Sequence, residues 1–367
     1  MDIRIKADQQ DSFTKGISLA IAEAGGVKLA KDEQADLNKT AYRGVDFKRL
    51  LKLVANEKGL TIKAGYDNIV DEYNLLNESA KDFYTAVLTS AANLILNKSY
   101  FESSASYRKW TGTGWVRDFK SCTPLTTSPF AQLNATPPGT APTKRNGIMS
   151  KFEAVTAKNY SEAIFLTFEA LINDDIAFFT SQAGIFGSGA ARAVNDAVYR
   201  KLISNPLLTT GYALFSENHN NLAANGGAPA ASTLEAGVVK ICGQKSGDLL
   251  LNVLPKYLIV PPSMSISSRK LLQETYGDGA EKIELVVDGL LSESTLPGYD
   301  ANAWYLTANP NEVGTVTVYT LPGGEFPIIR SANGRVGDAM DITFDVVYPF
   351  AVGVDGYVGM FKNDGGE

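Results

Sequence analysis

The sequence predicts an α+β protein built around a strand and a helix in the middle of the chain. Residues 160–168 alternate like a strand, and the helix that follows must end at Asn205 because Pro206 cannot continue it. Strand and helix patterns then alternate between residues 232 and 287, as in a compact α/β layer. Residues 304–361 show mostly the period-two alternation of strands.

Residues 1–115 are expected to form an N-terminal arm with helical segments. Residues 1–40 are polar with scattered alanine, and only residues 17–24 suggest a short helix. We therefore expect this stretch to be mobile unless a partner holds it. Apolar residues then recur at helical spacing in two runs, one ending near Gly59 and one covering residues 69–94. These runs predict an amphipathic helical layer, with docking of one helix on a neighbouring subunit as the alternative.

Residues 116–172 are expected to form an extended β-hairpin loop. The tip, residues 134–147, reads NATPPGTAPTKRNG. Its prolines remove hydrogen-bond donors and fix φ, which excludes a helix or a central strand. Because a two-stranded hairpin this polar cannot fold alone, it must find a partner surface elsewhere, which predicts an oligomer.

Residues 173–227 contain the central helix. Asn173 and the two aspartates after it predict a helix start, because a side-chain oxygen can cap free amides and carboxylates favour the positive end of the helix. Three glycines between residues 184 and 189 indicate a loosened turn, and a helix rich in small residues is expected from about Ala190. Its buried side is predicted to include Val194, Val198 and Leu202.

Two further segments complete the chain. Residues 228–300 hold two helix patterns and two strand patterns, and they are expected to form a compact inserted layer. Residues 301–367 are expected to supply β-strands. Asp355-Gly356 predicts a tight turn that joins the last two strands, residues 342–347 and 357–361, into a hairpin.

Charge and composition exclude several classes of protein. The net charge is -6; residues 1–120 hold 18 of the 34 basic and 16 of the 40 acidic residues, which leaves 16 basic and 24 acidic residues in the rest. No basic patch able to neutralise many phosphates is visible, so nearby DNA would be enclosed rather than gripped. No apolar run reaches the ~18 residues of a membrane helix, and the N-terminus lacks the apolar core of a secretory signal. We expect synthesis in a cytoplasm.

The chain offers little for catalysis or metal binding, and we expect no catalytic site, metal site or cofactor. His219 is the single histidine, and no nucleophile motif or spaced ligand set accompanies it, so a structural loop histidine is expected. Cys122 and Cys242 lie too far apart in sequence to indicate a disulfide framework or a metal site. Aromatic and basic residues interleave over residues 100–117 and could stack nucleic-acid bases, but only three or four positive charges are involved and acidic neighbours dilute them.

Three motifs in a fixed order carry a resemblance to a known family. They are WVRDFK at residues 115–120, an IND-D run followed by the helix AARAVNDAVYRKLISNP at residues 190–206, and GYALFSENHNNL at residues 211–222. Together they resemble the major capsid proteins of tailed bacteriophages, notably Mu-like head subunits, which carry the Hong Kong 97-like fold. The resemblance covers roughly residues 41–361. It implies an N-terminal arm, an extended loop, a peripheral domain with a long spine helix, and an inserted axial domain.

The resemblance also implies a function. Copies of the chain would assemble into hexamers and pentamers of an icosahedral shell that encloses double-stranded phage DNA, in a virion put together in the host cytoplasm. Scaffolding, portal and decoration proteins could join that shell. An encapsulin-type compartment is the alternative, and a soluble hydrolase or carbohydrate-binding domain is a weaker one. The candidate inter-subunit contacts are Trp110, Trp115, Arg117, Lys144, Arg145, Lys151, Glu274 and Glu281.

Overall fold

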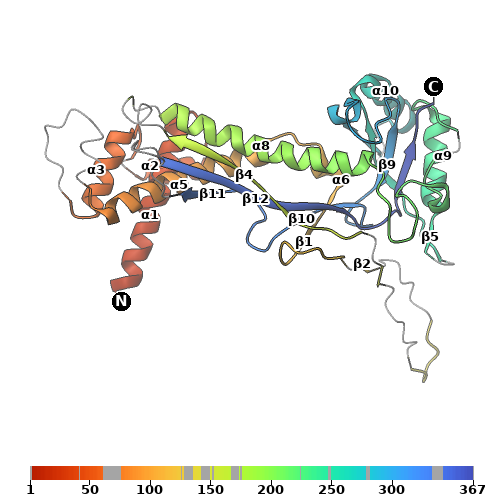
Figure 1. Cartoon of the computed structure of the whole chain (residues 1–367), viewed down its shortest axis with the longest axis horizontal. Coiled ribbons are helices and arrows are strands. Elements are labelled where there is room, and N and C mark those ends of the chain that lie inside the picture. Colours follow the sequence, from red (N-terminus) through yellow and green to blue (C-terminus); the bar gives the residue numbers. More distant parts are fainter. Residues whose placement is uncertain are drawn as a thin grey trace. The chain divides into compact units, whose positions relative to one another are not determined.

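The computed structural model describes residues 2–40, 42–60, 76–124, 126–127, 135–141, 149–150, 153–166, 173, 176–223, 225–246, 249–277, 282–332 and 342–366. The chain divides into two compact units (Figure 1). Unit one comprises Met1–Ser103, Asn159–Arg192 and Gly324–Pro349, and unit two comprises Ser104–Lys158, Ala193–Gly323 and Phe350–Glu367. The mixture of helices and sheets confirms the predicted α+β class.

Unit one contains a helical layer. Its helices are α1 (Asp2–Ala24), α2 (Lys31–Asn38), α3 (Phe47–Glu57), α5 (Glu78–Glu102) and the first part of α8 (Ile176–Ile203). Asp46 begins α3 by accepting a hydrogen bond from the Arg49 N–H at 2.5 Å, and Asn77 begins α5 by accepting one from the Ala80 N–H at 2.9 Å. The helical run predicted to end near Gly59 is confirmed by α3, and the run predicted over residues 69–94 is confirmed from Glu78 on by α5, whereas residues 69–75 lie outside the described residues.

The N-terminal helix is longer and better packed than the sequence suggested. The prediction of only a short helix over residues 17–24 is wrong, because α1 begins at Asp2. Its second half packs along α5 (Figure 1). Ile17 and Ile21 are fully buried in a core that also holds Val87 and Leu88 of α5. The expectation that this stretch needs a partner chain is therefore wrong for its buried half, since α5 already covers it.

The central helix α8 is continuous over 28 residues, so the loosened turn predicted at its glycines is wrong. The glycines serve close packing instead. A Cβ on Gly187 would overlap the carbonyl oxygen of Leu96 in α5, and the Ser99 hydroxyl donates to the Gly184 carbonyl at 2.6 Å. Small residues on one face thus let two helix backbones approach, and they leave the helix intact.

A sheet supplies the other layer of unit one. Its strands are β4 (Lys158–Leu166), β11 (Ile328–Ala332) and the first part of β12 (Ile342–Val354). β11 pairs with β12 in antiparallel register. Asn93 of α5 satisfies the backbone of Ile329 on β11, donating to its carbonyl at 2.9 Å and accepting from its N–H at 2.7 Å. This side chain ties the helical layer to the edge strand.

In unit two, β1 (Gly112–Trp115), β10 (Val316–Thr320) and the end of β12 form consecutive strands of a sheet. β1 runs parallel to β10, and its two glycines make room for that strand. A Cβ on Gly114 would lie 2.6 Å from the ring of Tyr319. β12 changes partner at Pro349: Val347 pairs with β11, and Phe350 pairs with β10. Proline lacks the N–H that a ladder needs, and it stands here between the register with β11 and the register with β10, where neither pairs with it.

A second sheet in unit two has the strand order β13-β9-β7-β8. Its strands are β7 (Pro255–Val260), β8 (Glu284–Val287), β9 (Trp304–Ala308) and β13 (Met360–Asn363). The flanking elements are α9 (Ala231–Cys242), α10 (Ser265–Tyr276), η1 (Glu217–His219), η2 (Pro262–Met264), η3 (Gly289–Ser292), β5 (Lys245–Ser246) and β6 (Leu249–Leu250). The strands and helices predicted between residues 232 and 287 are confirmed.

The predicted hairpin of the last two strands is wrong. β12 and β13 belong to different sheets, because β12 pairs with β10 and β11 whereas β13 pairs with β9. Residues 355–359 connect the two sheets rather than two neighbouring strands. The turn residues Asp355-Gly356 could not show whether the chain forms a hairpin or passes to another sheet, since both need the chain to change direction.

The long excursion of unit two is an antiparallel hairpin in its described part, but it is shorter than the predicted 116–172, because residues 158–166 form β4, which pairs with β12. β2 (Thr126–Thr127) pairs with β3 (Met149–Ser150), and Cys122 and Val155 exchange backbone hydrogen bonds of 2.9 and 2.8 Å nearer its base. Residues 135–141 at the tip are all exposed. The described part of the hairpin has no core of its own beyond the residues at its base.

Candidate assembly interface

The end of β1 and the loop after it present large aromatic side chains to solvent from a fixed backbone. Trp115 is 64% exposed and Phe119 is 53% exposed, and Arg117 and Lys120 are exposed beside them. Between them, the buried Val116 donates its N–H to the Thr320 carbonyl at 2.9 Å, which holds the loop to β10. Exposed aromatic side chains next to basic ones are typical of protein contact surfaces. Trp115 and Arg117 thus lie where another chain can reach them.

Trp110, another predicted contact residue, has no exposed surface and makes its contacts inside unit two. Its indole packs edge-on against the Tyr199 ring, and its N–H donates to the Tyr199 hydroxyl at 3.3 Å. Burial raises the pKa of Tyr199, and the nearby Asp288 raises it further, so the hydroxyl stays protonated. Trp110 therefore anchors the segment before β1 to α8.

A partly buried polar cluster surrounds this anchor. Asp288, between β8 and η3, accepts hydrogen bonds from the Ser106 hydroxyl at 2.5 Å and from the Asn195 amide at 2.8 Å. Asn195 also accepts the Tyr107 N–H at 3.1 Å, and the Ser106 and Tyr199 hydroxyls lie 2.8 Å apart. The cluster joins three segments that are distant in sequence, so it holds α6 (Tyr107–Trp110), α8 and the β8 corner in one arrangement.

A second group of polar side chains holds the base of the hairpin, which we call the hairpin root (Cys122, Glu153, Val155, Tyr319 and Asp355). Glu153 accepts the Lys201 ammonium of α8 at 2.6 Å with one oxygen and the Val354 N–H at 3.0 Å with the other. The Tyr319 hydroxyl donates to Asp355. Gly353 lies under Val155, since a Cβ there would overlap the valine side chain. The hairpin is therefore clamped where it leaves the body of unit two.

The remaining predicted residues have varied positions. Glu274 is exposed on α10, 3.7 Å from the Lys270 ammonium, so it stays available at the surface. Val194, Val198 and Leu202 are fully buried, which confirms the predicted buried side of the central helix. Four further candidates lie outside the described residues: Lys144, Arg145, Lys151 and Glu281.

His219 has a structural environment. Its ring stacks on Tyr357 with centroids 4.0 Å apart, and its nitrogens lie 3.1 Å from the Thr210 hydroxyl and 3.2 Å from the Leu214 carbonyl. Both cysteines are free. Over the described ranges, no group of three or more potential metal ligands comes together, and no helix is long and apolar enough to cross a membrane.

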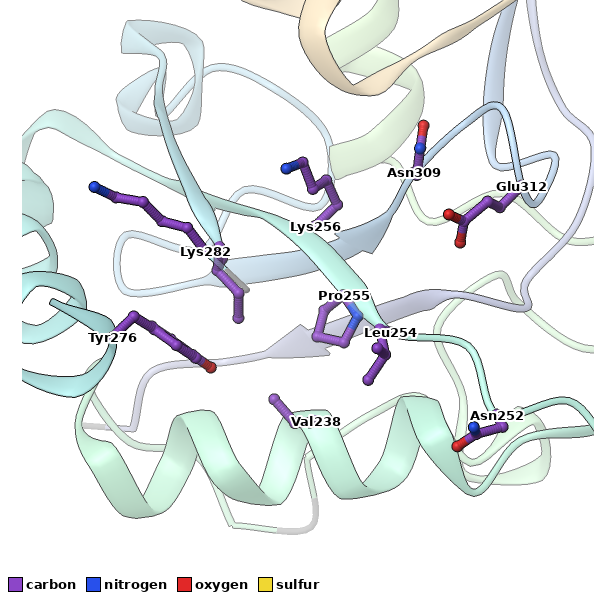
Figure 2. Close-up of a pocket in the computed structure, with 10 residues that line it drawn as sticks. Val238, Asn252, Leu254, Pro255, Lys256, Tyr276, Lys282, Asn309 and Glu312 are labelled. Carbon is purple, nitrogen blue, oxygen red and sulfur yellow. The ribbon is translucent and has the colours of Figure 1, made fainter. Parts of the chain in front are cut away.

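Unit two has an open hollow of 530 Å³ beside β7 and α9 (Figure 2). Val238 points from α9 toward Pro255, and the Tyr276 hydroxyl reaches into the space beside them (Figure 2). Lys256 pairs with Glu284 at 3.4 Å and points away from Val238 (Figure 2). The floor is apolar and the charged side chains stand at the rim, so this hollow does not bring a nucleophile, base and acid together.

Sequence reasoning missed both polar groups that position the exposed surface. Ser106, Asn195 and Asp288 are each unremarkable locally, and their partners lie up to 182 residues away. The hairpin root likewise draws on segments from four parts of the chain. The sequence held only weak signals for these two groups. They are Ser106, which stands before YRKW at residues 107–110, and Glu153, which stands between β3 and β4.

Comparison with known proteins gives the family. The model of a family described as phage capsid protein matches residues 152–363, which is more than half of the chain. No curated protein matches the sequence. A phage-related protein from Bordetella bronchiseptica RB50 is similar in structure, with a TM-score of 0.50 and 14% identity over 74% of this chain and 96% of that one.

Two other solved structures show weaker likeness. A virus-like particle from Pyrococcus furiosus has a TM-score of 0.45 and 12% identity over 74% of this chain and 97% of that one. A structure of Mycobacterium phage Patience has a TM-score of 0.43 and 11% identity, covering 76% of this chain and 87% of that one. On the family match, the chain belongs to the phage capsid protein family, and its role is that of a major capsid protein.

Proposed function

We propose that copies of this chain assemble into the hexamers and pentamers of an icosahedral phage head that encloses double-stranded DNA. The observation that carries this proposal is the hairpin, which is clamped at its root and exposed at its tip. A two-stranded hairpin without its own core gains stability only by lying on another surface. In a shell of identical copies, that surface belongs to the neighbouring subunit.

The segments then take the following roles. Residues 1–115 form the N-terminal arm with its helices, residues 116–172 form the extended loop, residues 173–227 and 301–367 form the peripheral domain, and residues 228–300 form the axial domain. Trp115 and Arg117 lie at contacts between subunits, and Glu274 faces neighbours around the ring. Lys144, Arg145, Lys151 and Glu281 complete these contacts.

The charge of the chain supports enclosure of DNA rather than specific binding. The net charge is -6, so the wall of a shell made from this chain does not adhere to packed phosphate, which counterions screen. Head assembly takes place in the host cytoplasm, with scaffolding, portal and decoration proteins as further partners. The chain serves as a structural subunit and not as an enzyme.

Sedimentation and negative-stain electron microscopy test this function. The chain is expressed alone and with its scaffolding partner, and the pelleted material is imaged before and after nuclease treatment. Closed shells whose DNA resists nuclease are expected when packaging components are present. Shells that instead hold a protein cargo would favour an encapsulin-type compartment. Material that stays monomeric at high concentration in both preparations would refute assembly.

A further inference from the structure

The hairpin root contains two carboxylates, those of Glu153 and Asp355, and they are held by different partners. Glu153, on the returning arm of the hairpin, is neutralised by Lys201, whose ammonium lies 2.6 Å away. Asp355, at the exit of β12, accepts hydrogen bonds from hydroxyl groups of β10, those of Tyr319 and Thr317, and the charge of Glu153 acts on it. The arrangement therefore places two carboxylates and one lysine at the point where the hairpin is attached.

We propose that the hairpin root is a proton-operated latch, in which the charge on Asp355 sets how firmly the returning arm is held against the end of β12. The connection is direct. Glu153 accepts the N–H of Val354, the residue next to Asp355, at 3.0 Å. Charge on Asp355 therefore repels the same carboxylate that fastens the arm, and a proton on Asp355 removes that repulsion.

The neighbours of Asp355 favour its neutral form. Burial raises the pKa of the Asp355 carboxyl, the hydroxyls of Thr317 and Tyr319 lower it by donating hydrogen bonds, and the charge of Glu153 raises it. Burial and the charge of Asp355 also raise the pKa of Tyr319, with smaller effects from Cys122 and Glu153, so Tyr319 remains a donor. These groups, together with Lys201 on the far side of Glu153, are the titratable groups at the root.

The direction of the pH effect follows from linkage. A carboxyl whose pKa is higher in the folded than in the unfolded state stabilises the fold fully below the unfolded pKa of about 3.9, and loses that contribution as the pH rises through its folded pKa. Acidification from neutral pH therefore tightens the root until Asp355 is protonated. At neutral pH the ionised Asp355 repels Glu153, so the returning arm is held less firmly.

Hydrogen exchange of the full-length protein, held in one assembly state, tests the latch. The amides of Cys122 and Val155 report on the root because they pair with each other across the two arms. After correction for intrinsic exchange, their protection should rise as the pH falls from 7 through the folded pKa of Asp355, which lies above its unfolded value. The rise should be at most about tenfold for each unit by which the folded pKa of Asp355 exceeds the unfolded one.

Asp355→Asn is the decisive variant, because it keeps an oxygen to accept the Tyr319 hydroxyl and cannot ionise. It should show high protection at pH 7 and no rise on acidification. The exposed Glu274→Gln should behave like the parent protein. An unchanged pH dependence in Asp355→Asn, or looser root amides at both pH values, would overturn the proposal.

If Asp355→Asn does not fold, a second variant tests whether Asp355 controls the root. Tyr319→Phe removes a hydrogen bond that favours the ionised carboxylate, so the midpoint of the protection change should move to higher pH. A midpoint that stays in place would show that Asp355 does not control the root.

Discussion

Replacement of Gly187 by alanine tests the packing of α8 on α5. An added methyl group in the middle of a helix normally stabilises it by about 0.5–1 kcal/mol, because glycine has more freedom to lose on folding. At position 187 that methyl would overlap the Leu96 carbonyl oxygen and lie 3.0 Å from both the Ser99 Cβ and the Tyr100 nitrogen. Two of these three atoms belong to the α5 backbone, so the helices must separate.

The size of the effect can be worked from these contacts. Forced separation of packed elements costs about 1–3 kcal/mol. It would also lengthen the 2.6 Å hydrogen bond from Ser99 to the Gly184 carbonyl, which contributes about 1 kcal/mol. After the propensity gain is subtracted, Gly187→Ala should destabilise the protein by about 1–3 kcal/mol. Urea denaturation of the unassembled chain, followed by far-ultraviolet circular dichroism, measures this change.

Gly189→Ala is the matched control, two residues along the same helix. The nearest atom to its new methyl group is a guanidinium nitrogen of Arg192 at 3.9 Å, so there is room for it. This variant should be stabilised by about 0.5–1 kcal/mol. If Gly187→Ala proved as stabilising as Gly189→Ala, the close approach of α8 to α5 would be refuted.

Three further predictions concern the edge strand, the partly buried cluster and the exposed loop. Asn93→Ala should cost about 1–3 kcal/mol in urea denaturation, because it leaves the backbone of Ile329 without two hydrogen bonds; a loss below 0.5 kcal/mol would show that the bonds are unimportant. Ser106→Ala should cost a similar amount by removing a donor from the partly buried Asp288, and an unchanged midpoint would contradict that role. Trp115→Ala should leave the melting temperature of the unassembled chain nearly unchanged, because the side chain is 64% exposed, yet it should reduce the yield of shells in a sedimentation assay. Equal shell yields would remove Trp115 from the interface.

The sequence was most informative where one segment decides its own structure. The apolar spacing of α3 and α5 and the stop at Pro206 are local signals, and the helices follow them. The buried side of α8 at Val194, Val198 and Leu202 was likewise readable from spacing alone. The resemblance carried by three motifs agrees with the family match.

Errors arose where a distant segment decides the outcome. Gly187 suggested a break in the helix, but its missing side chain instead leaves the space that Leu96 of α5 occupies. The burial of α1 was missed for the same reason. The apolar residues of α1 are sparse, and the α5 residues that cover them are more than sixty residues away in sequence. The separation of β12 from β13 depends on strand pairing with β9 and β10, which no local turn signal encodes.

The positions of the polar groups were unpredictable for a related reason. Ser106, Asn195 and Asp288 meet only after three segments have packed, and serine, asparagine and aspartate are common at surfaces and turns. The hairpin itself was predicted from its composition, but its attachment through Glu153 to Lys201 was not. A glutamate near a strand has many surface roles, and only the folded chain selects one.

A cryo-electron microscopy reconstruction of particles made from the full-length chain tests the central claim most directly. The claim is that the chain builds a shell from its own copies, with the hairpin lying on a neighbour. The predicted result is a closed shell of pentamers and hexamers in which residues 116–157 of one copy cross the adjacent copy and Trp115 lies at a contact. A hairpin folded back on its own subunit, or a sample containing only single chains, would contradict the account.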